Sequence, residues 1–228
     1  MRKVISLVLL IIIALGIFMV LKEIPFGAQS TKIGGYHLQE GGKETGATNI
    51  VTSVVLNYRG IDTLGEITVL FVAAIGLSAV LSIRRKKENR KIEPASLVLI
   101  TGCRFLFPLI LLFGAYIFIH GHLTPGGGFQ GGAIIASAFV LAYLGCRGRR
   151  FNETGSQIIE SLGGLIFVTF GLIGLAFSGH YFLSNFLPKG ELNFLFSAGI
   201  IPIIYIAIGF KVGSELAGII KHLMEESE

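Results

Sequence analysis

The sequence predicts an all-α integral membrane protein with about six transmembrane helices. Hydrophobic residues make up 52% of the 228 positions and charged residues only 14%, whereas a soluble domain of this size is about 25% charged. Six apolar stretches approach the ~20 residues that an α-helix needs to cross a bilayer core. Basic residues stand in short runs between these stretches, which is typical of topology signals.

The six predicted spans follow one another along the whole chain. They are predicted to be helices and not strands, because the alternating pattern of a membrane β-barrel is missing. The first stretch, with Arg2 and Lys3 before it and Phe26-Gly27-Ala28 after it, also fits a cleaved secretory signal, but its length favours a retained helix. The predicted spans are Val4 to Leu21, Leu64 to Ile83, Ala95 to Ile119, Phe129 to Cys146, Ile158 to Ser178 and Leu192 to Phe210.

The distribution of basic residues predicts the orientation of these spans. Basic segments alternate with connections that carry few Lys or Arg residues. Both ends of the chain fall on the basic side only if the number of spans is even. Both termini of this multi-pass cell-membrane protein are therefore expected in the cytoplasm. Beside apolar spans such runs indicate topology, so we expect no nucleic-acid partner. The basic segments are 2–3, 84–91, 147–150 and Lys221; the outward connections are 22–61, 120–128 and 179–191.

The basic run 84–91 is also the predicted internal boundary. It separates a two-helix N-terminal module, 1–91, from a four-helix module, 92–228. Within the outward loop 22–61, the Gly-rich part from Lys22 to Gly46 is expected to be irregular or to hold one short strand. The part from Thr48 to Tyr58 is expected to form a short helix capped by Thr48 or Asn49.

Two carboxylates, Asp62 and Glu66, stand four residues apart at the start of the second span, hence on one helical face. An ionisable group inside a span costs about 3 kcal/mol or more, so it usually faces a partner, the bundle interior or water. One hypothesis is a proton or cation relay at these residues. The alternative is structural: Asp62 caps the helix, and Glu66 pairs with Arg59 or with another subunit.

Arg104 lies about one third of the way through the third span, too deep to reach the interface easily. It is expected to pair with a carboxylate, for which Glu66 is a candidate, or with backbone carbonyls freed near Pro108. A structural ion pair and a role in transport both remain open.

The turn after the third span is unusually rich in glycine. Five glycines in seven residues allow close backbone approach, and Gly128 with Gly132 forms a GxxxG pair, which predicts tight packing of the fourth span. The turn lacks the Lys-Ser/Thr of a phosphate-binding loop. His120 and His122 suit either metal binding or proton transfer, or simple interfacial hydrogen bonding. The motif comprises Pro125, Gly126, Gly127, Gly128, Gln130, Gly131 and Gly132.

The remaining charged residues near the spans are predicted to be structural. Glu160 stands at the basic end of the fifth span, where the helix N-terminus favours a carboxylate. Lys211 and Glu215 are expected to form an ion pair at the end of the last span, near the cytoplasmic surface. Pro202 is expected to kink that last span.

Two stretches resemble components of one membrane complex. The segment from His122 to Gly132, HLTPGGGFQGG, resembles the B subunit of Mrp-type multisubunit sodium/proton antiporters, whose four-span layout fits 95–221. The segment 57–66, NYRGIDTLGE, is similar to the C-terminal extension of the large A subunit of these antiporters, where an equivalent acidic pair occurs in the membrane.

The resemblance implies a membrane subunit that contributes to the ion path and assembly of a sodium/proton antiporter. It implies sodium ions and protons as the transported ions, no cofactor on this chain, and other antiporter subunits and membrane lipid as partners. Related modules occur in membrane-bound hydrogenases and respiratory complexes, which provides a second hypothesis; a purely structural scaffold subunit is the third. The sequence contains neither a nucleophile paired with a general base nor an HExxH motif, so it indicates no catalytic site on the chain itself.

Overall fold

The computed structural model describes residues 2–23, 32–83, 95–145, 153–178 and 181–227. These residues are mostly helical, and six of the helices are long and apolar enough to cross a membrane, which confirms the predicted fold class. The helices in chain order are α1 (Arg2–Glu23), α2 (Lys32–Thr45), α3 (Ile50–Thr52), the π-helix η1 (Ser53–Tyr58), α4 (Gly60–Ile83), α5 (Leu97–Ile119), α6 (Gly128–Gly145), α7 (Glu153–Ser178) and α8 (Ile201–Ser227).

The chain forms two compact units, residues 1–36 and 37–228. In the first unit α1 is apolar all round, and its side chains from Val4 to Leu21 are exposed. A helix without a polar face is stable only in lipid or against other protein. The first unit is therefore consistent with a membrane-spanning helix.

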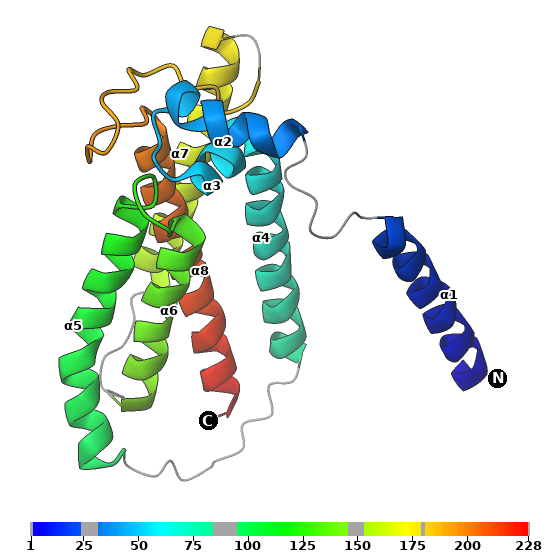
Figure 1. Ribbon diagram of the computed structural model, residues 1–228. Coiled ribbons are helices and arrows are strands. Elements are labelled where there is room, and N and C mark those ends of the chain that lie inside the picture. Colours follow the sequence, from blue (N-terminus) through cyan, green and yellow to red (C-terminus); the bar gives the residue numbers. More distant parts are fainter. Residues whose placement is uncertain (1, 24–31, 84–94, 146–152, 179–180, 228) are drawn as a thin grey trace. The chain divides into compact units, whose positions relative to one another are not determined.

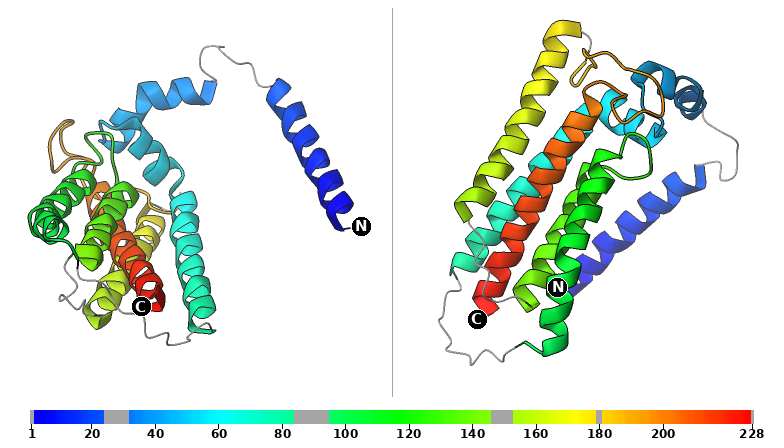
Figure 2. Two further views of the ribbon diagram at one scale, coloured as in Figure 1. Left: turned by 90° about the horizontal axis from the view of Figure 1, so that it is seen from below. Right: turned by 90° about the vertical axis from the view of Figure 1, so that its left-hand side faces the viewer.

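In the second unit α8 is the central helix of the bundle (Figures 1 and 2). It packs against α6, α7, α4 and α5, and it is the most deeply buried of the six spans. The core lies along α8, where Ile204, Ile208 and Val212 are almost fully buried. The other spans leave apolar side chains on the outer surface, as lipid or other membrane proteins require.

The last span begins nine residues later than predicted. The stretch from Leu192 to Ile200 forms turns, with positive φ at Asn193 (70°) and Ala198 (66°), and helix α8 starts at Ile201. Pro202 lies in the first turn, where its missing N–H has no partner within the helix, so the predicted kink is not needed. Helix α8 also continues to Ser227, so Lys211 and Glu215 lie within the helix and not at its end.

The described part of the Gly-rich segment, from 32 to 45, is helical, which corrects the expectation of an irregular loop or a strand there. Its helix α2 ends with the Thr45 hydroxyl donating to Gly41 O at 2.7 Å, and Lys43 pairs with Glu40 at 3.1 Å. Ser53 Oγ lies 2.7 Å from Thr45 Oγ1, so the end of α2 is fixed against the next helical segment. Tertiary contacts thus override the weak helix propensity of a Gly-rich segment.

The predicted cap at Asn49 is confirmed. Its side-chain oxygen accepts from the N–H groups of Val51 (3.1 Å) and Thr52 (3.5 Å). The basic runs 84–91 and 147–150, and with them the predicted boundary between the two modules, lie outside the described residues.

Candidate functional site

The glycine-rich turn between α5 and α6 is bound by the segment that precedes α3. Asn49 donates its side-chain N–H groups to Gly121 O (2.9 Å) and Thr124 O (3.0 Å). Its backbone N–H donates to His122 O at 3.0 Å. A single asparagine therefore satisfies three carbonyls that the turn does not pair within itself, which matters wherever water is scarce.

Helix α8 is connected to the same turn through Thr52. The Thr52 hydroxyl donates to Gly121 O at 2.7 Å, and the Tyr205 hydroxyl donates to Thr52 Oγ1 at 2.9 Å. Thr52 is fully buried and Tyr205 nearly so. We call these residues, Asn49, Thr52, Gly121 and Tyr205, the polar junction, because they hold α3, the turn and α8 together.

Glycines of the motif bring α6 against two neighbouring helices. A Cβ added at Gly131 would lie 2.7 Å from Gly114 O of α5, and one at Gly132 would lie 2.9 Å from Gly209 O of α8. At Gly128 the nearest atom, Ile208 Cβ of α8, would be 2.6 Å away. All these distances are below normal carbon contacts, so only glycine permits this packing.

The other motif residues shape the turn rather than a binding site. Gly126 packs on Ile117 O of α5, and Gly127 packs on the ring of Tyr205. Pro125 and Gln130 are exposed. The motif therefore serves helix packing and the polar junction in this chain.

Substitution of Gly132 by alanine is expected to destabilise the chain by about 1–3 kcal/mol, because the added methyl group overlaps Val212 and the backbone of α8. Gly102 of α5 is the matched control, since a Cβ there meets nothing within 4 Å. Thermal unfolding in detergent should show a lower midpoint for Gly132→Ala than for Gly102→Ala. Equal midpoints would contradict the packing role.

The two histidines of the turn lie in different environments. His120 stacks on Tyr116, with ring centroids 4.3 Å apart, whereas His122 is fully buried. No group of three or more His, Cys, Asp or Glu able to hold a metal ion occurs in the described part of the chain. Burial lowers the pKa of His122, although backbone groups of Phe194 and Leu195 oppose this shift. The neutral form of His122 is thus favoured in the fold.

Acidification is therefore expected to weaken this region. Because the pKa of His122 is lowered in the folded state, the unfolded chain binds more protons below about pH 6.5, and stability is lost as the pH falls through this range. Thermal unfolding at about pH 7.5 and pH 5.5 should show a smaller loss for His122→Asn than for the unmodified chain. His120→Asn is the control and should keep the original pH dependence. The same loss in both variants would refute the assignment.

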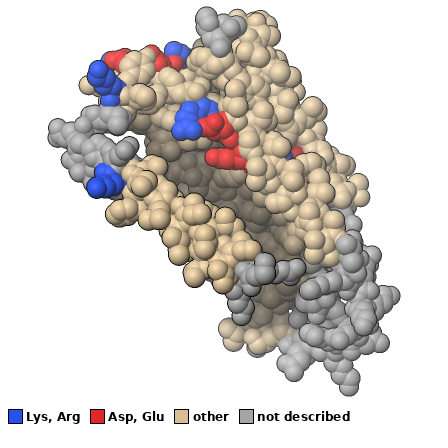
Figure 3. Space-filling view, turned by 90° about the vertical axis from the view of Figure 1, so that its right-hand side faces the viewer, with Lys and Arg blue, Asp and Glu red and all other residues tan. Residues whose placement is uncertain are grey.

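The predicted acidic pair lies on the outer face of α4. Asp62 forms an ion pair with Arg59 and is exposed. Figure 3 shows one face of the chain, on which acidic and basic side chains lie side by side on a largely uncharged surface. Glu66 is also exposed and makes no hydrogen bond or ion pair with any described residue. Arg59 therefore pairs with Asp62, and the predicted alternative of an ion pair between Arg59 and Glu66 is not formed. Glu66 is thus free to meet a group outside this chain.

Arg104 is exposed on α5 and has no ion-pair partner among the described residues. The predicted pair with Glu66 is not formed, because α4 and α5 pack on different sides of α8 (Figure 2). Both charges face outward from the bundle. In lipid each would cost several kcal/mol, so both indicate contact with other protein.

An ion pair inside α8 is the feature that sequence reasoning misplaced. Lys211 Nζ lies 2.6 Å from Glu215 Oε2, and the side chains are 8% and 1% exposed. The pair was expected at the helix end, but α8 continues to Ser227 and buries it against α7 and α4. The apolar run after Glu215, Leu216 to Ile220, was the signal for a longer helix.

A bundle of membrane-spanning helices with a buried ion pair and unmatched outward charges defines a multi-pass subunit of a membrane assembly. Residues 98–218 match the family described as domain related to MnhB subunit of Na+/H+ antiporter. This match covers more than half of the chain, so the protein belongs to that family, and the resemblance drawn from 122–132 is confirmed. Residues 1–96 match the family of the MBH E-subunit.

Three relatives illustrate this membership. An uncharacterized protein of Methanocaldococcus jannaschii is 34% identical over 75% of this chain and 74% of its own length. A probable K+/H+ antiporter A/B-subunit of Rhizobium meliloti is 30% identical over 67% of this chain, which corresponds to 18% of that longer protein. A putative antiporter subunit mnhB2 of Staphylococcus aureus is 36% identical over 44% of this chain and 68% of its own length.

Two solved structures share the fold. A chain of the membrane-bound sulfane sulfur reductase, an archaeal respiratory membrane complex, is 46% identical over 97% of both chains, with a TM-score of 0.80. A chain of the Mrp complex from Dietzia sp. is 26% identical over 97% of this chain and 26% of its own length, with a TM-score of 0.76. Both neighbours are subunits of membrane complexes, and this chain likewise belongs with other membrane subunits.

Proposed function

We propose that this chain is a membrane subunit of an antiporter module that exchanges sodium ions for protons. The observation that carries the proposal is the Lys211–Glu215 ion pair, almost fully buried in a membrane-spanning helix. Burying two charges costs more than apolar packing of the same volume, so a scaffold alone gives no reason for it. Ionisable residues inside spans are typical of ion pathways. Membership of the MnhB-related family supports the same function.

The outward charges support the proposal that the ion path continues into other subunits. Asp62 and Glu66 present carboxylates on α4, and Arg104 presents a guanidinium on α5. Partner helices with polar or charged groups would satisfy them. We place both termini in the cytoplasm on the basis of the basic segments in the sequence.

Substitution of Glu66 by glutamine tests the relay role. The change removes the ionisable group but keeps its size, so sodium-driven proton movement in vesicles carrying the complex should fall to background while the complex still assembles. Glu191→Gln is the matched control, because Glu191 is exposed in the loop before α8 and should leave exchange unchanged.

The scaffold hypothesis gives the opposite result in this experiment. Under it, Glu66→Gln and Asp62→Asn would lower the yield of complex, and the complex that remains would exchange ions normally. Measuring both the yield and the exchange rate per complex therefore separates the two hypotheses.

A respiratory complex is the second candidate for the parent assembly. It is favoured by the end-to-end likeness, at 46% identity, to a chain of the sulfane sulfur reductase complex. The match of residues 1–96 to the MBH E-subunit family points the same way. In that case the antiporter module would be driven by, or would drive, redox chemistry on other subunits.

Purification in mild detergent decides between these parents. A tagged chain in a respiratory complex is expected to bring down subunits that carry iron–sulfur clusters, detectable by mass spectrometry and by visible absorption. Recovery of antiporter subunits alone would contradict the respiratory assignment and leave the sodium/proton exchange proposal intact.

A further inference from the structure

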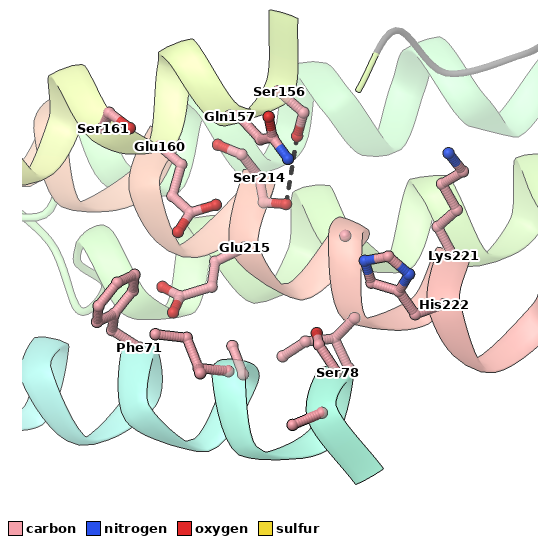
Figure 4. Close-up of a pocket in the computed structure, with 15 residues that line it drawn as sticks. Phe71, Ser78, Ser156, Gln157, Glu160, Ser161, Ser214, Glu215, Lys221 and His222 are labelled. Atoms are coloured by element: carbon pink, nitrogen blue, oxygen red, sulfur yellow. Dashed lines mark hydrogen bonds between the residues drawn. The ribbon is translucent and has the colours of Figure 1, made fainter. Parts of the chain in front are cut away.

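A cavity of about 710 Å³ lies between α4, α7 and α8, next to the buried ion pair (Figure 4). Helix α4 contributes mainly apolar side chains, such as Phe71 and Ile75, together with Ser78. Helices α7 and α8 contribute the polar side, which includes Gln157, Glu160 and other groups. The cavity is therefore polar on one side only.

Glu215 lines the cavity, and one of its carboxylate oxygens has no hydrogen-bond partner among the described residues. Its Oε2 accepts from Lys211, whereas its Oε1 is buried and makes no hydrogen bond within the described residues. The side chain is 1% exposed. A buried carboxylate oxygen without a donor costs about 1–3 kcal/mol or more, so a donor or cation that binds there would be stabilising.

A second carboxyl group, Glu160 of α7, lines the same cavity within electrostatic reach of both Glu215 and Lys211. Figure 4 shows the carboxyl groups of Glu160 and Glu215 turned toward one space. Gly163 permits this arrangement, because a Cβ there would lie 2.6 Å from Ala207 O of α8. The close helix contact holds Glu160 beside the ion pair.

We propose that this cavity is a proton-binding site in which Glu160 and Glu215 share one exchangeable proton beside Lys211. At the ion pair itself two carboxylates face one ammonium, because Lys221, which also lines the cavity, lies about 9 Å further along α8. A single bound proton removes the excess negative charge at that place. The proposal rests on the proposed function and identifies protons as the ions that use this part of the chain.

The charge beside the cavity favours a proton over a sodium ion. Oxygen-bearing side chains line α7 and α8, whereas the α4 wall offers a single hydroxyl, from Ser78, so the preference rests on the ammonium group next to Glu215 and not on the number of oxygen atoms. The Lys211 ammonium already occupies one oxygen of Glu215 and lies 5.5 Å from the ring centroid of Phe71. A second cation at that place would face this positive charge at close range.

The approach to the site runs along α8. His222, two helical turns beyond Glu215, lines the same cavity but is exposed, so the lining changes from exposed to buried over roughly 10 Å. The ionisable groups that line the cavity are Glu160 from α7 and Glu215, Lys221 and His222 from α8, while α4 contributes none. Lys211 flanks it through its pair with Glu215.

The chemical step is a simple proton transfer. A hydronium ion in the cavity gives its proton to an oxygen of Glu160; the hydronium O–H bond breaks as the carboxyl O–H bond forms, and water leaves. The two carboxyl groups make no hydrogen bond to each other in the structure, so a rotation of the Glu160 side chain or a bridging water then carries the proton to Glu215 Oε1. Release follows the reverse path.

Labelling of the unmodified complex with dicyclohexylcarbodiimide tests this site without requiring transport. The reagent adds to protonated carboxyl groups in apolar surroundings, and mass spectrometry locates the adduct. Modification of Glu160 or Glu215 is expected to be several times greater at about pH 6 than at about pH 9, and unchanged by sodium at constant pH. Labelling that is independent of pH would overturn the proposal, and protection by sodium would show a sodium site instead.

The Glu160→Gln variant gives the second measurement. Proton uptake by vesicles carrying the complex should fall at least about tenfold, a loss in the range expected when a proton-transferring group is removed. Glu191→Gln should behave as the unmodified chain. Normal uptake in Glu160→Gln would overturn the role of Glu160. If the unmodified complex shows no exchange but pH-dependent labelling persists, the proposed function fails and the proton site stands.

Discussion

The fold depends on the polar junction, because a turn next to the membrane has to find partners for its backbone carbonyls. Asn49 and Thr52 supply these partners to the turn after α5, and Tyr205 of α8 holds Thr52 in place. This fixes the position of α3 and η1, and α4 follows directly from them. The acidic residues at the start of α4 are therefore placed by hydrogen bonds to a turn some 70 positions away in the sequence.

The position of the charged pair follows from the glycines of α6. Because α6 approaches α8 at Gly128 and Gly132 without intervening side chains, α8 can be enclosed on several sides. A helix at the centre of a bundle buries most of its surface, so the charged side chains at 211 and 215 are withdrawn from bulk solvent and pair with each other. Glycine packing and charge burial are thus parts of one arrangement.

Sequence reasoning was most reliable where one physical signal dominated. Hydropathy predicted the six spans, and side-chain chemistry predicted the Asn49 cap. It was wrong for α2, whose helix depends on contacts with the residue 53 region, and for the start of α8, where apolar residues from 192 to 200 form turns. It missed the depth of the Lys211–Glu215 pair for the same reason, because burial is a property of the neighbours of a helix and is not encoded in its own residues.

Helix α4 carries both the outward charges and one wall of the interior cavity. Its first turns present Asp62 and Glu66 outward, and its later turns, from Phe71 to Ala79, form the apolar wall of the cavity. At 1.5 Å per residue, Glu66 and Ser78 are about 18 Å apart along one continuous helix. A partner protein that binds the acidic face therefore contacts the same rigid element that closes the cavity around Glu160 and Glu215. Energetic coupling between two sites requires such an element, and here the chain itself provides it.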